Sequence, residues 1–487
     1  MNSRIAWAAC IALLLVGFFA FVFYLDRYPP PYYDEGAYNQ PAVRTLEGLS
    51  INWPMAVSAP YGTLVWGYHG PFFPHMQVLT FRLLGVSAFA SRIPQFVAAF
   101  LGILLLGGTL IRFGCPWSAI LIAVFWLGDR SLVEDLYGRM DGIALLFVVC
   151  ALGTFTKWLS TGRGVALFWT GVFAGTAMGF HPVTWTFMAG IGAAALLLAP
   201  AGARRSVVYY GMGLALPAVA WLAFLAPYFA ESLQQFRWYL HNAKHMGLLG
   251  RAWNMIVVLR WSRYWAIALV AVTVLFLLPV MAAILLRYRS GASRPHPLIL
   301  STGLFALCGF GALLTVNQMP YYLIHFSVWP VAAVLVIIET KGLPRKFHKP
   351  ALAALALLVV AWLPSAAWNG MRWREARILY PMLDPAPFVD RVRAVVPPGA
   401  PIEVSPDYFV LIRPIGHDLV RLPLGLASEL PSNKWLVLSN NDVALLGGAQ
   451  APGLRGRTVA YSGLLFPGTR AGGSMTVFSP LGAGAKP

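Results

Sequence analysis

Eleven apolar stretches of roughly membrane-spanning length follow one another along this chain of 487 residues. A helix needs about 20 apolar residues to cross the hydrocarbon core of a bilayer. Only 11% of the residues are charged, against about 25% in a soluble globular chain. No small-residue cleavage site follows the first stretch, so we expect it to stay as a helix. We predict an α-helical polytopic membrane protein with about eleven helices, at 5–25, 90–111, 115–128, 140–158, 164–180, 182–199, 206–229, 264–286, 297–315, 320–338 and 350–367.

The positive charge of the chain follows this helix pattern. With the N-terminus inside, the inner segments hold thirteen basic residues against a single acid, Glu339, whereas the outer loops before residue 367 are nearly balanced. Basic inner loops are what the positive-inside rule requires. The net charge of +18 is therefore explained by orientation, and we expect no nucleic-acid partner. The cysteines do not pair by spacing, so we expect free thiols.

Two outer loops are long, 26–89 and 230–263, and the composition changes after residue 367. There proline, charge and short β-branched runs appear, together with the helical period of "PFVDRVRAVV" at 387–396. Such runs are typical of short strands. We predict a transmembrane domain over 1–367, and a small soluble extracytoplasmic α/β domain over 368–487.

Two adjacent acids, Asp34 and Glu35, follow the first expected helix and its proline run. Prolines end a helix, and a helical pattern resumes after them. One interpretation makes Asp34 a helix N-cap and Glu35 a first-turn acid. The other makes a carboxylate at the membrane exit a general base for an acceptor hydroxyl, because ionisable groups at such depth are usually functional.

The second outer loop, "DRSLVEDLYGRMDG" at 129–142, adds further charges beside the membrane: Glu134, Asp135, Arg139 and Asp141. Acids placed where helices emerge can face one shared outer cavity. An arginine there can hold a phosphate. The alternatives are a helix cap for Asp141 and a headgroup-level arginine for Arg139.

With these motifs in order, the chain resembles the GT-C membrane glycosyltransferases, in particular the branch of protein O-mannosyltransferases and lipid A aminoarabinose transferases. The resemblance rests on the Asp-Glu pair after the first helix and on four later segments. It covers roughly residues 1–340. The segments are "YHGPFFPHMQVLTFRLLG" (68–85), "SRIPQFVAAFLG" (91–102), "GRMDGIALLF" (138–147) and "NQMPYYLIHFSVWP" (317–330).

The resemblance implies roles for particular residues. Asp34 would be the catalytic base, and Glu35 would orient it or the acceptor. Arg139 and Asp141 would line the donor site. Further substrate-binding candidates are His69, His181, Arg237, Tyr321 and His325.

The sequence departs from the aminoarabinose branch at His69, where that branch has lysine, and at Gly70, where it has proline. A neutral histidine is a poorer phosphate partner than lysine, so the identity of the donor is open. Arg237 lies in the loop 230–263. Two roles are open for it: it binds the donor phosphate, or it contacts membrane headgroups.

We expect no metal site, since no fixed-spacing motif is present, although Asp34, Glu35, Glu134, Asp135 and His181 carry ligand types that a divalent metal accepts. No cofactor is certain.

The resemblance implies an inverting glycosyltransferase that moves a sugar from a polyprenyl-phosphate donor to a lipid, glycan or protein acceptor. We expect it in the bacterial inner membrane, with its site facing the periplasm. The alternatives are a polytopic transporter, disfavoured by missing repeats, and a catalytically inactive glycan-binding relative.

Overall fold

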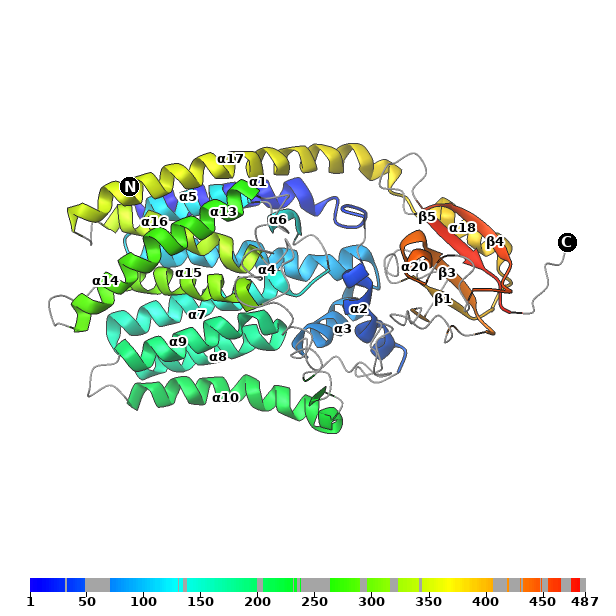
Figure 1. Ribbon diagram of the computed structural model, residues 1–487, viewed down its shortest axis with the longest axis horizontal. Helices are drawn as coiled ribbons and strands as arrows, with labels where there is room; N and C mark the ends of the chain where they lie inside the picture. The colour runs from blue at the N-terminus through cyan, green and yellow to red at the C-terminus, as the bar shows by residue number, and fades with distance from the viewer. Residues whose placement is uncertain are drawn as a thin grey trace.

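The computed structural model places the apolar stretches in one bundle of roughly parallel and antiparallel helices, with a small sheet domain beyond one end (Figure 1). It describes residues 1–30, 33–48, 71–129, 131–134, 138–198, 205–230, 232–233, 237, 263–289, 296–315, 323–340, 344–405, 418–419, 430, 432–446, 448, 454–465 and 474–481.

Each of the eleven expected stretches forms a helix over most of its described residues. Among the described residues, seven helices are long and apolar enough to cross a membrane, and four shorter apolar helices accompany them. The bundle consists of α1 (Ser3–Val22), α4 (Ala88–Arg112), α5 (Pro116–Leu127), α7 (Asp141–Thr161), α8 (Gly164–Phe180), a 3₁₀ turn (Pro182–Thr184) leading into α9 (Trp185–Leu198), α10 (Arg205–Leu225), α13 (Arg263–Ala271), a π-helical segment (Val272–Leu277) leading into α14 (Leu278–Arg289), α15 (Pro297–Thr315), α16 (Ile324–Thr340) and α17 (His348–Leu379).

The two ends of the bundle differ in chemistry. We call the end where α4 and α7 begin the site end, and the opposite end, where α4 finishes with Arg112, the basic end. Glu339, the one acid expected among the inner segments, accepts the backbone N–H groups of Trp117 and Ser118 at 3.0 and 2.7 Å. A carboxylate at a helix N-terminus satisfies unpaired amides and the helix dipole, so Glu339 caps α5 at the basic end.

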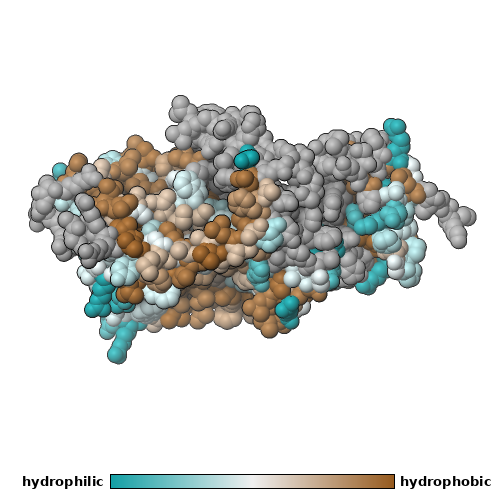
Figure 2. All heavy atoms as spheres, turned by 90° about the horizontal axis from the view of Figure 1, so that it is seen from below, coloured by the Kyte–Doolittle hydropathy of each residue, from teal (hydrophilic) through white to brown (hydrophobic). Residues whose placement is uncertain are grey.

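Close helix packing depends on small residues, as it does in membranes generally. A Cβ on Gly171 of α8 would clash with the carbonyl oxygen of Tyr210, and one on Gly213 of α10 would clash with that of Phe168. The backbones of α8 and α10 therefore touch. The opposite face of α10 exposes apolar side chains, and apolar residues are spread over the described part of the bundle, whereas the sheet domain is more hydrophilic (Figure 2).

At the site end, α2 (Tyr33–Leu46) and α3 (Phe72–Leu84) lie outside the bundle (Figure 1), and the short α6 (Ser131–Glu134) connects α5 to the segment before α7. The helical pattern that resumes after the prolines corresponds to α2, and most of its described side chains are buried. One apolar core includes Val43 of α2, Phe81 of α3, Ala376 of α17 and Val392 of the sheet domain. The outer segments and the sheet domain are thus packed together rather than loosely tethered.

The described residues of the C-terminal part form α18 (Ala386–Val395), α20 (Asn440–Leu445) and five strands: β1 (Ile402–Val404), β2 (Asp418–Leu419), β3 (Trp435–Ser439), β4 (Val459–Leu464) and β5 (Ser474–Phe478). The strand order is β2-β1-β3-β5-β4. Strand β1 is parallel to β2 and β3, and β5 is antiparallel to β3 and β4. The expected small α/β unit is present.

The last bundle helix is longer than its apolar stretch. We expected helix only to residue 367, with a domain boundary there, but α17 continues to Leu379. The charged segment after residue 367 ends the apolar pattern without breaking the helix, because it contains good helix formers such as Arg372 and Glu375, which form an ion pair at 2.6 Å.

All four cysteines are free thiols.

Candidate functional site

Three bundle helices bring charged and imidazole side chains together at the site end. Asp141 is the first residue of α7, His181 directly follows α8, and His325 is the second residue of α16. Because successive helices run in opposite directions, the start of α7, the end of α8 and the start of α16 lie at the same end of the bundle. Residues 184 positions apart in the sequence therefore make direct contact.

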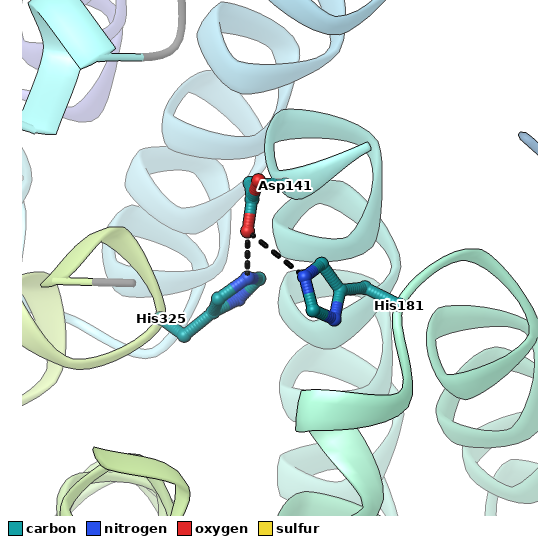
Figure 3. Close-up of side chains that lie close together, drawn as sticks. All are labelled: Asp141, His181 and His325. Atoms are coloured by element: carbon teal, nitrogen blue, oxygen red, sulfur yellow. Dashed lines mark hydrogen bonds and ion pairs between the residues drawn. The ribbon is translucent and has the colours of Figure 1, made fainter. Parts of the chain in front are cut away.

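Asp141 is the centre of this cluster (Figure 3). Its Oδ2 accepts a hydrogen bond from Nε of Arg139 at 2.9 Å. Its Oδ1 lies 2.9 Å from Nε2 of His325 and 3.4 Å from Nε2 of His181. All four residues are buried, at 1 to 5% exposure. A charge at such depth is tolerated only when it is paired, and here one carboxylate is surrounded by three nitrogen-bearing side chains.

Asp141, His181 and His325 have the donor types of a zinc site. One potential ligand atom from each of them lies within 4.8 Å of the others. The hydrogen bonding of His181 does not fit a metal, however. Its Nδ1 accepts the backbone N–H of Val183 at 3.1 Å. A neutral imidazole has one donor and one acceptor nitrogen, so Nε2, the nitrogen facing Asp141, carries the proton. A metal bound at Nε2 would need the lone pair of that nitrogen, so the ring proton would have to sit on Nδ1. The hydrogen bond from Val183 to Nδ1 would then be lost.

A second buried ion pair fixes α2 against the bundle. Glu35 is fully buried, and Arg92 of α4 binds both of its carboxylate oxygens at 2.7 Å. Ser91 donates a third hydrogen bond to Oε1 at 2.7 Å. The other arm of Arg92 donates to the carbonyl of Leu25 at 3.0 Å. A bidentate arginine–carboxylate pair is among the strongest and most directional contacts, so the orientation of α2 is tightly set.

The two buried networks are linked through α2. The guanidinium of Arg139 lies over the ring of Tyr38, 5.1 Å from its centroid. Asn39 donates to the carbonyl of Glu35 at 2.7 Å and to that of Gly138 at 3.4 Å. Gly138 has no room for a side chain, because a Cβ there would lie 2.7 Å from the hydroxyl of Ser91. Helix α2, which carries Asp34, is therefore held against the segment that leads to Asp141.

A further buried acid, Asp129, lies just beyond the end of α5 and is 2% exposed. It accepts the backbone N–H of Ser131 at 2.9 Å. Asn369 of α17 donates to the carbonyls of Leu127 and Asp129, which caps the end of α5. Burial raises the pKa of the Asp129 carboxyl above its usual range, and hydrogen bonds to the carboxylate oppose that rise only in part.

We expect Asp129→Asn to be tolerated. A raised pKa means that folding favours the neutral acid, so this stabilising contribution is present at low pH and is lost as the pH rises through the folded-state pKa. Asparagine cannot ionise, so the variant should match or exceed the wild-type thermal midpoint at neutral pH. Thermal unfolding in detergent, scanned between about pH 4 and pH 8, checks this. A large fall in the midpoint of the variant at neutral pH would show that Asp129 is buried as a charged partner.

The structure groups some of the predicted residues and leaves others aside. Arg139, Asp141, His181 and His325 form one cluster, and Glu35 lies in the neighbouring network. Arg237 is exposed. The backbone of Asp34 belongs to α2, while its side chain and those of His69, Glu134, Asp135 and Tyr321 lie outside the described residues.

Sequence reasoning missed Arg92, Tyr38, Asn39 and Asp129. Arg92 had a usable signal, because it is a charged residue inside an expected membrane-spanning stretch, where charges are costly and usually functional. Its partner Glu35 was already a candidate. Tyr38 and Asn39 offered no signal, since an aromatic and an amide on a surface helix are ordinary.

Comparison with solved structures places this architecture among known folds. No model of a known protein family matches the sequence, and no curated protein matches it. The crystal structure of ArnT from Cupriavidus metallidurans in the apo state is similar over 98% of both chains, with a TM-score of 0.55 and 15% sequence identity.

A second structure of ArnT from Cupriavidus metallidurans, bound to undecaprenyl phosphate, matches 96% of this chain and 97% of its own, with a TM-score of 0.52 and 16% identity. The similarity therefore covers the helical bundle, the outer segments and the C-terminal sheet together. The chain has the fold of the GT-C membrane glycosyltransferases.

Proposed function

We propose that this protein transfers a sugar from a polyprenyl-phosphate donor to an acceptor at the site end of its helical bundle. The observation that carries the proposal is the buried cluster of Arg139, Asp141, His181 and His325 beside the helix that bears Asp34. Support comes from the ArnT structure bound to undecaprenyl phosphate, which is similar in fold over 96% of this chain.

In this mechanism Asp34 accepts the proton of the acceptor hydroxyl or amine as the acceptor atom attacks the anomeric carbon. The bond between that carbon and the phosphate oxygen breaks, and the configuration inverts. The polyprenyl phosphate leaves as an anion, so no general acid is needed at neutral pH. Catalysis then depends on a base and on cations that stabilise the leaving phosphate.

Arg139 is the cation that we assign to the donor side. Asp141 holds its Nε at 2.9 Å, which fixes the plane of the guanidinium, and Tyr38 lies against its face. A fixed guanidinium binds phosphate oxygens without losing conformational freedom at the moment of reaction. His181 and His325 position Asp141 from the other side. Glu35, fully buried against Arg92, acts through the placement of α2 and not by touching substrate.

We place the site end, with α2, α3 and the sheet domain, on the periplasmic side of the inner membrane. The support is the basic end opposite it, where α4 finishes with Arg112 and α1 starts beside Arg4. A transporter would need ionisable groups along the middle of its helices. Among the described residues of the bundle, the buried acids and arginines lie near helix ends, which favours a reaction at one face.

The hydrogen bonding of His181 predicts that transfer needs no bound metal. We expect the purified enzyme to keep most of its rate after treatment with excess EDTA, and to carry substoichiometric zinc by elemental analysis. Loss of both activity and a stoichiometric ion, with recovery on adding zinc, would show that His181 gives up its bond to Val183 and ligates a metal.

The experiment that tests the proposed function compares cells with and without the protein by mass spectrometry of their envelope lipids, glycans and surface proteins. We expect one class of molecule to lose a single sugar when the protein is absent and to regain it with the wild-type chain. A glycan-binding relative without activity would change no covalent structure. Identical spectra under conditions in which the protein is expressed would overturn the proposal.

A further inference from the structure

A groove opens on the bundle far from the Asp141 cluster, between α4, α7 and α8 towards the basic end. Its volume is about 310 Å³, at the lower limit of ordinary ligand pockets. Its walls are mostly apolar, and two cations, Arg112 and Lys157, lie among its lining residues. None of the described residues that line it is acidic.

The groove exists because α7 presents small residues where it faces α4. Gly153 has no side chain, and a Cβ there would meet only the hydroxyl of Thr109, at 3.2 Å. Cys150, about one turn before Gly153, and Thr154, the residue after it, are also small and line the same space. Phe173 of α8 and Leu105 of α4 line it as well. The result is an apolar trough, open to the surrounding membrane because Leu105 is 45% exposed.

The charges lie at the end of the trough that faces the aqueous phase. Arg112 is the last residue of α4, and Lys157 is one turn before the end of α7. Both side chains are exposed. Two cations above an apolar trough match the two halves of a lipid, since a phosphate binds the cations and an acyl chain fills the trough.

We propose that this groove is a binding site for an anionic phospholipid of the leaflet at the basic end. Arg112 and Lys157 bind the headgroup phosphate, and one acyl chain lies along Gly153 between α4 and α7. Arginine and lysine side chains near helix ends ordinarily reach to the headgroups of whichever lipid is present. The groove adds a defined position for one acyl chain, and this distinguishes a specific lipid-binding site from a general headgroup contact.

Native mass spectrometry can test this site with phosphatidylglycerol and phosphatidylcholine as probes, mixed in equal amounts with the purified protein. We expect the wild-type chain to retain one phosphatidylglycerol in preference to phosphatidylcholine. Arg112→Gln/Lys157→Gln should lose that preference. The matched control is Arg4→Gln/Lys349→Gln, which removes the same charges from exposed positions outside the groove and should keep it.

Gly153→Leu tests the trough separately from the charges. It should displace the retained lipid while Arg112 and Lys157 stay in place, and its folding can be checked by thermal unfolding. Two results would overturn the proposal: an equal loss of preference in Arg112→Gln/Lys157→Gln and in the control Arg4→Gln/Lys349→Gln, or full retention of the lipid by Gly153→Leu. Either result indicates general attraction of anionic lipid to the basic end.

A second readout needs no substitution. Cys150 lines the groove and is partly exposed, whereas the other three cysteines are buried. Phosphatidylglycerol should slow alkylation of Cys150 by a small neutral thiol reagent, and phosphatidylcholine should protect it less. Equal protection by the two lipids would contradict a site that selects an anionic headgroup. Neither readout depends on sugar transfer, so the outcome is independent of the proposed function.

Discussion

Asp34→Asn is expected to lower the rate of sugar transfer by about 10²- to 10⁴-fold, the usual contribution of a general base. Asparagine keeps the size of the side chain and its ability to cap a helix, but it cannot take a proton from the acceptor. Folding should be unaffected, because the contacts that hold α2 are made by Glu35 and Asn39. The measurement is the initial rate of donor consumption by purified wild-type and variant proteins.

Glu47→Gln is the matched control for this variant. Glu47 follows the other end of α2 and lies 3.5 Å from Arg44, so its substitution removes one acid from the same surface segment. We expect near-normal rates. If Asp34→Asn also transfers at a near-wild-type rate, Asp34 is a helix cap and the base must be sought elsewhere at the site end.

Breaking the Glu35–Arg92 pair is expected to have the largest effect on stability. Removing one partner leaves the other as an uncompensated buried charge, which costs about 3–5 kcal/mol. Both Glu35→Gln and Arg92→Gln should therefore lower the thermal midpoint sharply and reduce the yield of monodisperse protein. Arg393→Gln, which breaks an exposed pair with Asp390 on α18, should change little, because surface ion pairs contribute little.

The double variant Glu35→Leu/Arg92→Met separates a buried charge from lost packing. With both charges gone, no buried charge is left uncompensated, although Ser91 and the carbonyl of Leu25 each lose one hydrogen bond, so the double variant should be more stable than either single one. If the loss of stability in the double variant equalled the sum of the losses in the two single variants, the two residues would not act as a pair. Whatever its stability, the double variant should transfer poorly, because α2 loses the contacts that fix Asp34.

Much of the fold could be predicted because membrane spans depend on a local property. Each apolar window gave a helix, and the short β-branched runs after residue 367 gave strands. The extension of α17 to Leu379 could not be read from hydropathy, since the helix continues after it leaves its apolar stretch. The order of the strands depends on which edges pair in space, and no short run of sequence specifies that.

The candidate site was predictable residue by residue but not as an arrangement. Asp141, His181 and His325 each had ordinary explanations as a cap, a loop residue and a helix residue. Their convergence comes from helix packing, which joins positions far apart in the chain. The pairing of Glu35 with Arg92 likewise depends on how α2 docks against α4. A charge inside a membrane span implies a nearby partner, and that rule could have directed attention to Arg92.

The central claim is that a sugar leaves a lipid phosphate at the site end of this bundle. The most direct measurement follows a purified, membrane-reconstituted protein given polyprenyl-phosphate sugars, with membranes of the host cell as the source of acceptor. We expect free polyprenyl phosphate and a newly glycosylated molecule to appear in equal amounts with the wild-type chain, and neither with Asp34→Asn. Donor that stays intact with every sugar offered, or equal release by the Asp34 variant, would contradict the account.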